Sequence, residues 1–264
     1  MRSSATSSGV RPSSGGDTGR QPKYQRIAAR LREAIEAGEY GPGERLPGEN
    51  DLMAEHGVAR MTARQALGVL QAEGIVEARK GAGVFVRDFK PIRRRGLERL
   101  AHAQWGEGRS IWSADAGDRE LLVDSVEVGE EDAPAAIAGV LGLGEGGRVC
   151  VRRRRYVLDG KPVLLATSFL AADLASGMPI ARPDTGPGGV YARLEELGRK
   201  PVHFREEVRS RMPSGDEAER LALPTGVPVM LIARTAFDTA GVAVEVNSMV
   251  LDSAAYVLEF DFEA

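Results

Sequence analysis

The order of elements near the N-terminus constrains the fold of this 264-residue chain more than any other feature. Apolar residues recur every three or four positions in residues 24–35, which predicts a helix with one buried face. Two further helices are expected at 49–57 and 60–73, each followed by a glycine or a turn. Two apolar stretches, 75–79 and 84–87, flank a glycine-rich turn and predict a β-hairpin.

Three helices followed by a two-stranded hairpin make a winged helix-turn-helix, whose third helix enters the major groove of DNA with its first residues at the base edges. Arginine can bond guanine through two parallel hydrogen bonds, and threonine can meet a phosphate or a thymine methyl group. Glycines in the hairpin let the backbone approach DNA closely. The expected DNA-contacting residues are Asn50, Arg60, Thr62, Arg64, Gln65, Lys80 and Gly81. The alternative is that these polar residues form only a solvated helix face. That interpretation would suit one helix alone but not three helices followed by a hairpin.

Charge is divided unevenly along the chain. The net charge is −3, yet residues 21–95 hold 14 Lys and Arg against 10 Asp and Glu, so the remainder is net acidic. This division suits a DNA-binding head at residues 22–88 on a separate body at residues 109–264. Residues 89–108 are expected to be a linker with one helical turn. The basic residues at 90–95 either extend the contact with phosphates or are simply solvated.

Other sequence features concern the N-terminal tail, the cellular compartment and membrane association. Residues 1–21 are rich in Ser, Gly, Thr and Arg, which predicts a disordered tail. A passive tail is the simpler interpretation, although its arginines could also touch DNA phosphates. The single cysteine, Cys150, excludes a disulfide within one chain and suits a reducing cytoplasm. The sequence contains no run of 18 or more apolar residues, so no membrane span is predicted. We therefore expect a cytoplasmic protein without membrane contact.

The body alternates strand-like and helix-like segments. Stretches centred on Asp159-Gly160 and Ala240-Gly241 predict two β-hairpins. A short helix after Ser214 begins with a suitable N-cap and two acidic residues in its first turn. Strands with interspersed helices and hairpin turns predict an antiparallel α+β domain.

Four stretches of the head resemble the GntR family of bacterial regulators. They are PGERLPGE at 42–49, GVARMTARQAL at 57–67, EGIV at 73–76 and KGAGVFV at 80–86, and together they span most of the head in the right order. The chain departs from the family where Gly48 and Ala59 replace a frequent Ser, Met61 replaces Thr or Ser, and Asn50 replaces Arg. Asparagine favours adenine over the guanine that arginine reads, so no operator sequence is carried over from relatives.

The body resembles the UTRA effector domain found in the HutC branch of that family. The supporting stretches are 152–155, 159–163, 167–170, 190–198 and 241–246. This resemblance implies a fold like that of chorismate lyase, a homodimer, and a small effector that changes affinity for a double-stranded DNA operator. It implies a transcriptional regulator, most simply a repressor, with a phosphorylated or carboxylated metabolite as effector.

Four consecutive arginines at 152–155 are the main candidates for contact with an effector. Because alternate residues of a strand share a face, Arg152 and Arg154 point to one side and the other two to the opposite side. A buried arginine matches carboxylate or phosphate geometry, and Ser168 on the return strand can donate to the same anion. The resemblance places Arg154 at a ligand-binding position, and Glu245 can accept from a ligand or hold an arginine. The alternative is an exposed basic strand with Glu245 as its ion-pair partner.

Two other functions are alternatives to an effector-controlled regulator. An enzyme is not expected, because the three histidines, His56, His102 and His203, have no recognisable partners for nucleophilic or metal-dependent chemistry. No catalytic residue, metal site or cofactor is therefore predicted. A regulator that binds DNA without any effector remains the other alternative.

Overall fold

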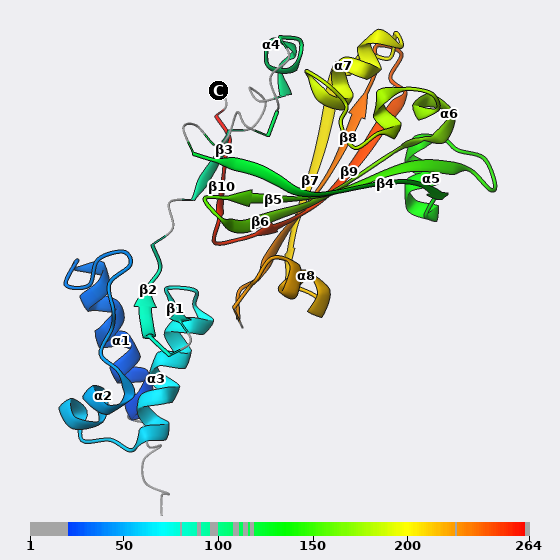
Figure 1. Ribbon diagram of the computed structural model, residues 1–264. Coiled ribbons are helices and arrows are strands. Elements are labelled where there is room, and N and C mark those ends of the chain that lie inside the picture. Colours follow the sequence, from blue (N-terminus) through cyan, green and yellow to red (C-terminus); the bar gives the residue numbers. More distant parts are fainter. Residues whose placement is uncertain are drawn as a thin grey trace, which may run out of the picture.

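The computed structural model describes residues 21–79, 81–88, 91–95, 100–107, 111–112, 116, 119–224 and 226–261. Figure 1 shows a small head of three helices and a hairpin, followed by a body built on one large sheet. The expected contact residue Lys80 and nearly all of the expected N-terminal tail lie outside the described residues. Among the described residues, no helix combines the length and apolar composition needed to cross a membrane.

The head contains the three helices and the hairpin that the sequence predicts. They are α1 (Lys23–Glu36), α2 (Glu49–His56), α3 (Arg60–Ala72), β1 (Val76–Arg79) and β2 (Gly83–Val86). Apolar side chains from all five elements meet in one core that includes Leu31, Leu52 and Leu70. The sharp turn between α2 and α3 depends on Gly57, whose φ of 59° is a left-handed conformation that glycine adopts without strain.

The segment expected to be a linker contains a strand that the sequence did not indicate. β3 (Ile92–Arg95) pairs in parallel with β10 (Tyr256–Glu259) near the C-terminus, and a one-turn helix, α4 (His102–Trp105), follows. Ile92 and Arg94 are buried while the two arginines next to Arg94 are exposed. The strand depends on a partner far away in sequence, so local patterning could not predict it.

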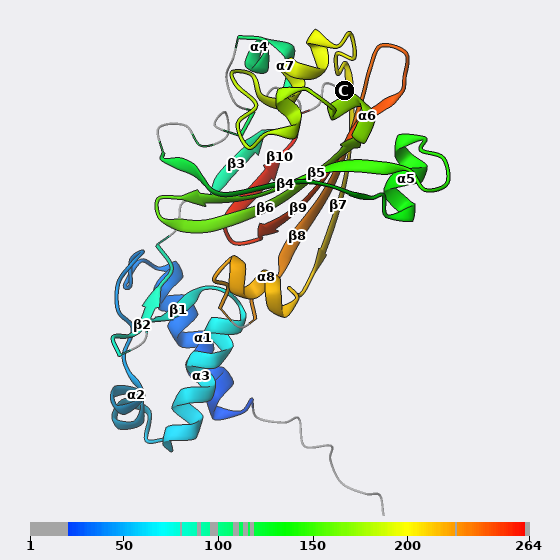
Figure 2. The same cartoon turned by 45° about the vertical axis from the view of Figure 1, so that its right-hand side comes forward.

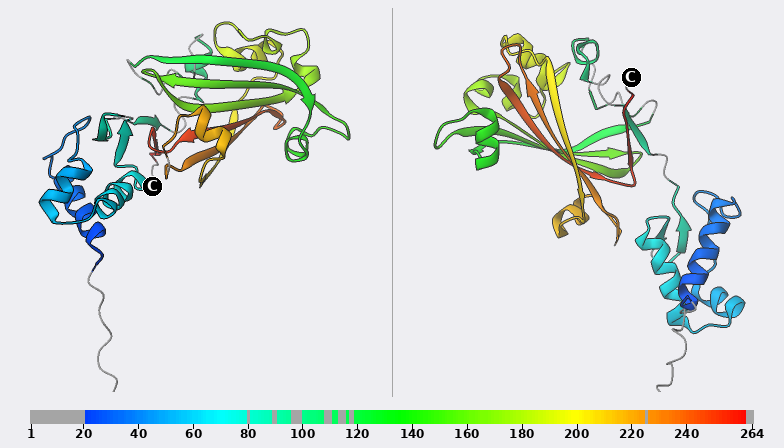
Figure 3. Two further views of the ribbon diagram at one scale, coloured as in Figure 1. Left: turned by 60° about the horizontal axis from the view of Figure 1, so that its bottom comes forward. Right: turned by 180° about the vertical axis from the view of Figure 1, so that it is seen from behind.

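Six long strands form the main sheet of the body (Figure 3). They are β4 (Leu121–Asp132), β5 (Arg148–Leu158), β6 (Lys161–Ala171), β7 (His203–Arg211), β8 (Val229–Phe237) and β9 (Ala243–Asp252). The order across the sheet is β4-β5-β6-β9-β8-β7, and every neighbouring pair is antiparallel. Asp159 and Gly160 join β5 to β6 with positive φ values of 48° and 79°, as a tight hairpin turn requires.

Short helices cover the two faces of this sheet. They are α5 (Ala135–Leu141), α6 (Ala172–Ala175), the 3-10 helix η3 (Pro179–Ala181), α7 (Gly189–Glu196) and α8 (Gly215–Arg220). One face is covered at one end by α4, α6, η3 and α7, and at the other end by the β3–β10 pair. The opposite face packs against α5 and the end of α8. Figure 2 shows α8 on the side of the sheet nearest the head. The expected α+β class with an antiparallel sheet is confirmed.

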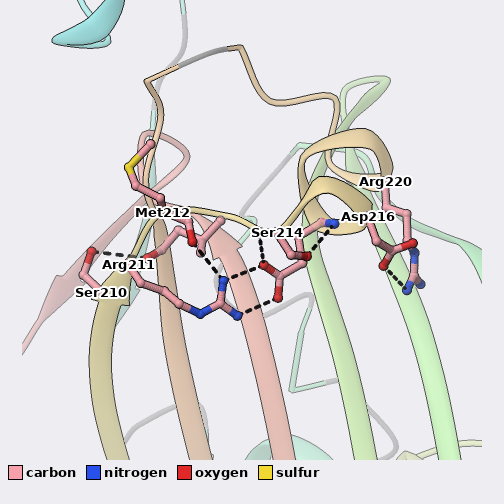
Figure 4. A network of polar contacts seen from close by, with 8 residues as sticks. Ser210, Arg211, Met212, Ser214, Asp216 and Arg220 are labelled. Atoms are coloured by element: carbon pink, nitrogen blue, oxygen red, sulfur yellow. Dashed lines mark hydrogen bonds and ion pairs between the residues drawn. The ribbon is translucent and has the colours of Figure 1, made fainter.

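Helix α8 begins with the N-cap that the sequence predicts (Figure 4). The Ser214 hydroxyl accepts a hydrogen bond from the Glu217 amide at 3.2 Å, and the Glu217 carboxylate accepts one from the Ser214 amide at 2.8 Å. Arg211 at the end of β7 donates to both oxygens of Glu217, at 2.6 and 2.7 Å. The hydrogen bonds from Arg211 lower the pKa of the Glu217 carboxyl to about 2.

We predict that Glu217→Gln lowers the stability of the full chain at neutral pH by about 1 kcal/mol, the usual effect of one cap or ion pair. The folded pKa of about 2 lies below the ordinary value of 4.5, so the stabilisation is complete above pH 4.5 and is lost as the pH falls toward 2. Thermal unfolding of both proteins across this range should therefore show a gap that narrows with acidification. Asp216→Asn, which removes a weaker 3.7 Å pair with Arg220, is the matched control. A gap that stays constant down to pH 2 would contradict the prediction.

Candidate nucleic-acid interface and ligand pocket

The first two turns of α3 present polar side chains to solvent. Arg60, Arg64 and Gln65 are exposed and Thr62 is half-buried, whereas Ala63 and Ala66 pack into the core of the head. The expected contact residues Asn50 and Gly81 are also exposed. Ala59 is the N-cap of α3 and makes no side-chain hydrogen bond there, so the first amides of the helix are left for other acceptors.

Glu49 holds the arginines of α3 in place, a role that the sequence did not indicate. Its two carboxylate oxygens accept hydrogen bonds from Arg64 Nε at 2.7 Å and Arg64 Nη2 at 3.2 Å. Arg60 Nε lies 3.9 Å from the same carboxylate, and Arg60 Nη2 donates to Asn50 Oδ1 at 3.0 Å. The hydrogen bonds from Arg64 lower the pKa of the Glu49 carboxyl. Asn50, Arg60 and Arg64 therefore form one connected surface.

A row of polar side chains crosses five strands of the main sheet, on the face that α7 and the β3–β10 pair cover. Neighbouring strands bring these residues side by side through the pairs Arg152–Ser168, Ser168–Asn247, Asn247–Arg234 and Arg234–Glu206. We call these five residues the polar row. Four of them are at most 2% exposed, and the Glu206 side chain is 15% exposed. Arg154 and Glu245 lie on the same face, next to the row.

The helices at one end of this sheet face and the β3–β10 pair at the other end leave a gap between them. The polar row lies in this gap. On one side, Leu170 and Ala236 pack under the helices, and on the other, Tyr156 and Met249 pack under the β3–β10 pair. A cavity of about 510 Å³ occupies the gap. Its walls include Trp112, Tyr191 and the loop that leads into α7. The volume is within the range of pockets that hold small metabolites.

Arg152 holds one wall of this cavity. Its guanidinium donates to the carbonyl oxygens of Ile180 and Arg182, and to that of Pro183 at 2.9 Å. Burial, together with the neighbouring charge of Arg154, lowers the pKa of Arg152. The predicted effector residue Arg152 therefore has most of its hydrogen-bonding capacity committed to the loop after η3.

Arg154 of β5 and Ser168 of β6 lie together. Arg154 Nη2 donates to Ser168 Oγ, which also accepts a hydrogen bond from Asn247 Nδ2 at 3.1 Å. Within the described part of the chain, Arg154 Nε and Asn247 Oδ1 are buried and have no hydrogen-bond partner. The cavity is thus lined by one residue with an unsatisfied donor and one with an unsatisfied acceptor, both hydrogen-bonded to Ser168.

Arg234 is the most deeply buried cation of the cavity, at 1% exposure. Its guanidinium carbon lies 5.5 Å from the Trp112 ring centre and 5.6 Å from that of Tyr191. Burial opposes its charged form, but Tyr191, Glu245 and Glu206 outweigh burial and raise its pKa. No described residue accepts a hydrogen bond from its Nε or Nη1.

Glu245 is buried beside these arginines rather than exposed. Its side chain is 2% exposed and accepts a hydrogen bond from the Tyr191 hydroxyl at 2.9 Å. The half-buried arginines on the opposite face of β5 have other partners, since Arg153 donates to Glu131 and Arg155 to Asp124. The alternative of an exposed basic strand paired with Glu245 therefore does not describe this face.

Sequence reasoning missed four residues of the site, namely Trp112, Arg234, Asn247 and Glu206. A usable signal exists for Arg234, because it is a polar residue between Ile232 and Ala236, two buried apolar residues on the same face of the strand. No such signal exists for Trp112, which lies outside every helix and strand that the sequence predicts. No group of three or more His, Cys, Asp or Glu side chains that could hold a metal ion occurs in the described parts of the chain.

Comparison with known families covers most of the chain. The model of the bacterial regulatory proteins of the gntR family matches residues 23–86, and the UTRA domain model matches residues 118–256. The first of these stretches contains α1 to β2, and the second contains the cavity's sheet. The two domain types expected from the sequence are thereby confirmed.

Similar proteins are regulators of transcription rather than enzymes. An HTH-type transcriptional regulator of Streptomyces coelicolor is 32% identical over 92% of this chain and 93% of its own length. The HTH-type transcriptional repressor NagR of Bacillus subtilis is 28% identical over 85% of this chain and 88% of its own.

Solved structures agree with this assignment. A crystal structure of a GntR-family transcriptional regulator has a TM-score of 0.60 at 28% identity, covering 92% of this chain and 98% of that one. The structure of PhnF from Mycobacterium smegmatis, at 24% identity, covers 90% of this chain and 99% of its own, and its TM-score of 0.53 supports the fold. The chain therefore belongs to the GntR family of bacterial transcriptional regulators, in the HutC group that joins a helix-turn-helix domain to a UTRA effector domain.

Proposed function

We propose that this regulator represses transcription, and that a small metabolite carrying a carboxylate or phosphate group binds between Arg154 and Arg234 and changes its affinity for DNA. The observation that carries the proposal is the set of buried, unsatisfied donors on these two arginines, which line one cavity. A buried cation with free N–H groups is best satisfied by an anion that accepts from several of them at once.

Three further features support an anion at this place. Arg152, Arg154 and Arg234 bring three guanidinium groups to the cavity, while Glu245 is its buried carboxylate. Helix α7 begins at the cavity wall, and the N-terminus of a helix favours negative charge. Glu245 and Tyr191 can bind hydroxyl or amino groups elsewhere on the same ligand. A ligand with an anionic end and a polar end fits this arrangement.

On the DNA side, we propose that Arg60, Thr62, Arg64 and Gln65 of α3 contact the operator, with Asn50 and the wing around Gly81 beside them. The exposed N-terminal turns of α3 support this assignment, since this is the part of a recognition helix that reaches base edges. The protein would act as a homodimer in the cytoplasm, because two heads are needed to read two half-sites of an operator. The Bacillus subtilis relative is described as a repressor, which is consistent with this direction of control.

The recognition helix is tested by Arg64→Ala in the full chain. Loss of a bidentate contact with a base should weaken binding to the promoter of its own gene by about 1–3 kcal/mol, which is roughly ten- to hundredfold. Fluorescence anisotropy at fixed salt concentration measures the change. Arg209→Ala, which removes an exposed arginine from β7, controls for the altered net charge. Unchanged affinity of Arg64→Ala would show that α3 does not read the operator through Arg64.

The effector pocket is tested with inorganic phosphate as the probe. We expect phosphate to change the fluorescence of Trp112, which lines the cavity, and to raise the melting temperature of the full chain. Arg154→Met should weaken both responses at least tenfold, because the buried Nε and Nη donors are removed. Arg153→Met, on the next residue but the opposite face, should respond like the wild type. Equal phosphate affinity in Arg154→Met and the wild type, or none in the wild type, would refute the pocket and favour a regulator without an effector.

A further inference from the structure

The strand that follows the head is attached to the body by a buried arginine. Arg94 in β3 is 2% exposed, while the side chains of Arg93 and Arg95 are 62% and 65% exposed and pair with Glu259 of β10. A buried charge in a four-residue strand requires a specific reason, since an arginine without adequate partners is costly to bury. The basic stretch that the sequence suggested for phosphate contact therefore divides into two exposed arginines and one that points into the body.

Arg94 reaches the end of the polar row. Its Nη2 lies 3.3 Å from Glu206 Oε1 and 3.3 Å from Met249 Sδ. The same Glu206 oxygen lies 4.0 Å from Nη1 of Arg234, the buried arginine of the cavity. Glu206 therefore stands between an arginine of the linker strand and an arginine of the ligand pocket.

Trp112 connects the same two sites. The guanidinium carbons of Arg94, Arg154 and Arg234 lie 5.8, 5.8 and 5.5 Å from its ring centre. Three positive charges around one partly buried ring repel one another, and such repulsion is poorly screened in a protein interior. An anion at Arg154 and Arg234 would offset this repulsion, and Glu206 would then be drawn more fully toward Arg94.

We infer that Arg94 is a positioning residue that couples the ligand pocket to β3, the strand through which the DNA-binding head is attached. An anion bound at Arg234 strengthens the Glu206–Arg94 contact and holds β3 more firmly. Because coupling between two sites is reciprocal, Arg94 in turn strengthens anion binding although it does not line the cavity. This inference rests on the proposed function only in requiring that the cavity takes an anion.

The coupling is tested by phosphate titration of full-length variants, followed through tryptophan fluorescence. Arg94→Met should weaken phosphate binding about five- to tenfold, a coupling of ordinary size. Arg94→Lys, which keeps the charge, should restore most of the affinity. Arg95→Met removes an exposed arginine from the same strand and should bind phosphate like the wild type. Glu206→Gln should bind phosphate more tightly, because a negative charge near the site is removed.

Opposite effects of Arg94→Met and Glu206→Gln separate coupling from simple loss of packing, since both variants remove a buried partner and both should lower the melting temperature. Hydrogen exchange gives the second measurement. Phosphate should slow exchange of the β3 and β10 amides in the wild type and in Arg95→Met, but not in Glu206→Gln.

The outcomes distinguish the two proposals. Wild-type affinity in Arg94→Met, or phosphate-induced protection of β3 that persists in Glu206→Gln, would overturn the coupling while leaving the pocket in place. Failure of the wild type to bind phosphate would overturn the pocket and the coupling together. If Arg94→Met does not fold, hydrogen exchange of Glu206→Gln still decides the matter, because the coupling requires that phosphate no longer protects β3 in this variant.

Discussion

A charged side chain buried in a protein must find partners, because removing it from water costs several kilocalories per mole. The polar row shows how this sheet meets that requirement step by step. The two Nη atoms of Arg152 donate to loop carbonyls, and Ser168 accepts from both Arg154 and Asn247. Donors remain unsatisfied on Arg154 and Arg234, two arginines that line the cavity. The polarity of the pocket is thus set by the arginines of this face that lack full hydrogen bonding within the protein.

The same constraint explains where the cavity lies. Apolar residues on either side of the row pack against other elements, the helices at one end and the β3–β10 pair at the other. Neither the helices nor the pair packs over the charged middle, so space remains there. Gly188 completes the wall, because a Cβ at this position would lie 2.5 Å from the Trp105 carbonyl oxygen. With the loop after η3 already held by Arg152, little ordering is left for a ligand to bring about, which favours affinity.

Much of this arrangement could be predicted from the sequence. The remaining features could not, for a physical reason. Helical spacing and turn residues located the head, and the arginine run marked β5 with the correct alternation of faces. The polar row itself depends on the register of five strands that are far apart in sequence, which local patterns do not encode. The same holds for β3, whose partner strand lies near the opposite end of the chain. Glu49 was missed because its function depends on the angle between two helices.

The ion pair between Glu49 and Arg64 has a consequence for how the head searches DNA. An arginine held by a carboxylate presents less net positive charge to the phosphate backbone, and it must give up that partner before it can bond a base. Any contact of Arg64 with DNA therefore carries the cost of breaking this ion pair, since a phosphate and a guanine edge can each offer two acceptors to one arginine. On the proposed role of Arg64, Glu49 would lower the affinity for DNA wherever Arg64 has to leave the carboxylate, and the operator would have to supply contacts that offset this cost.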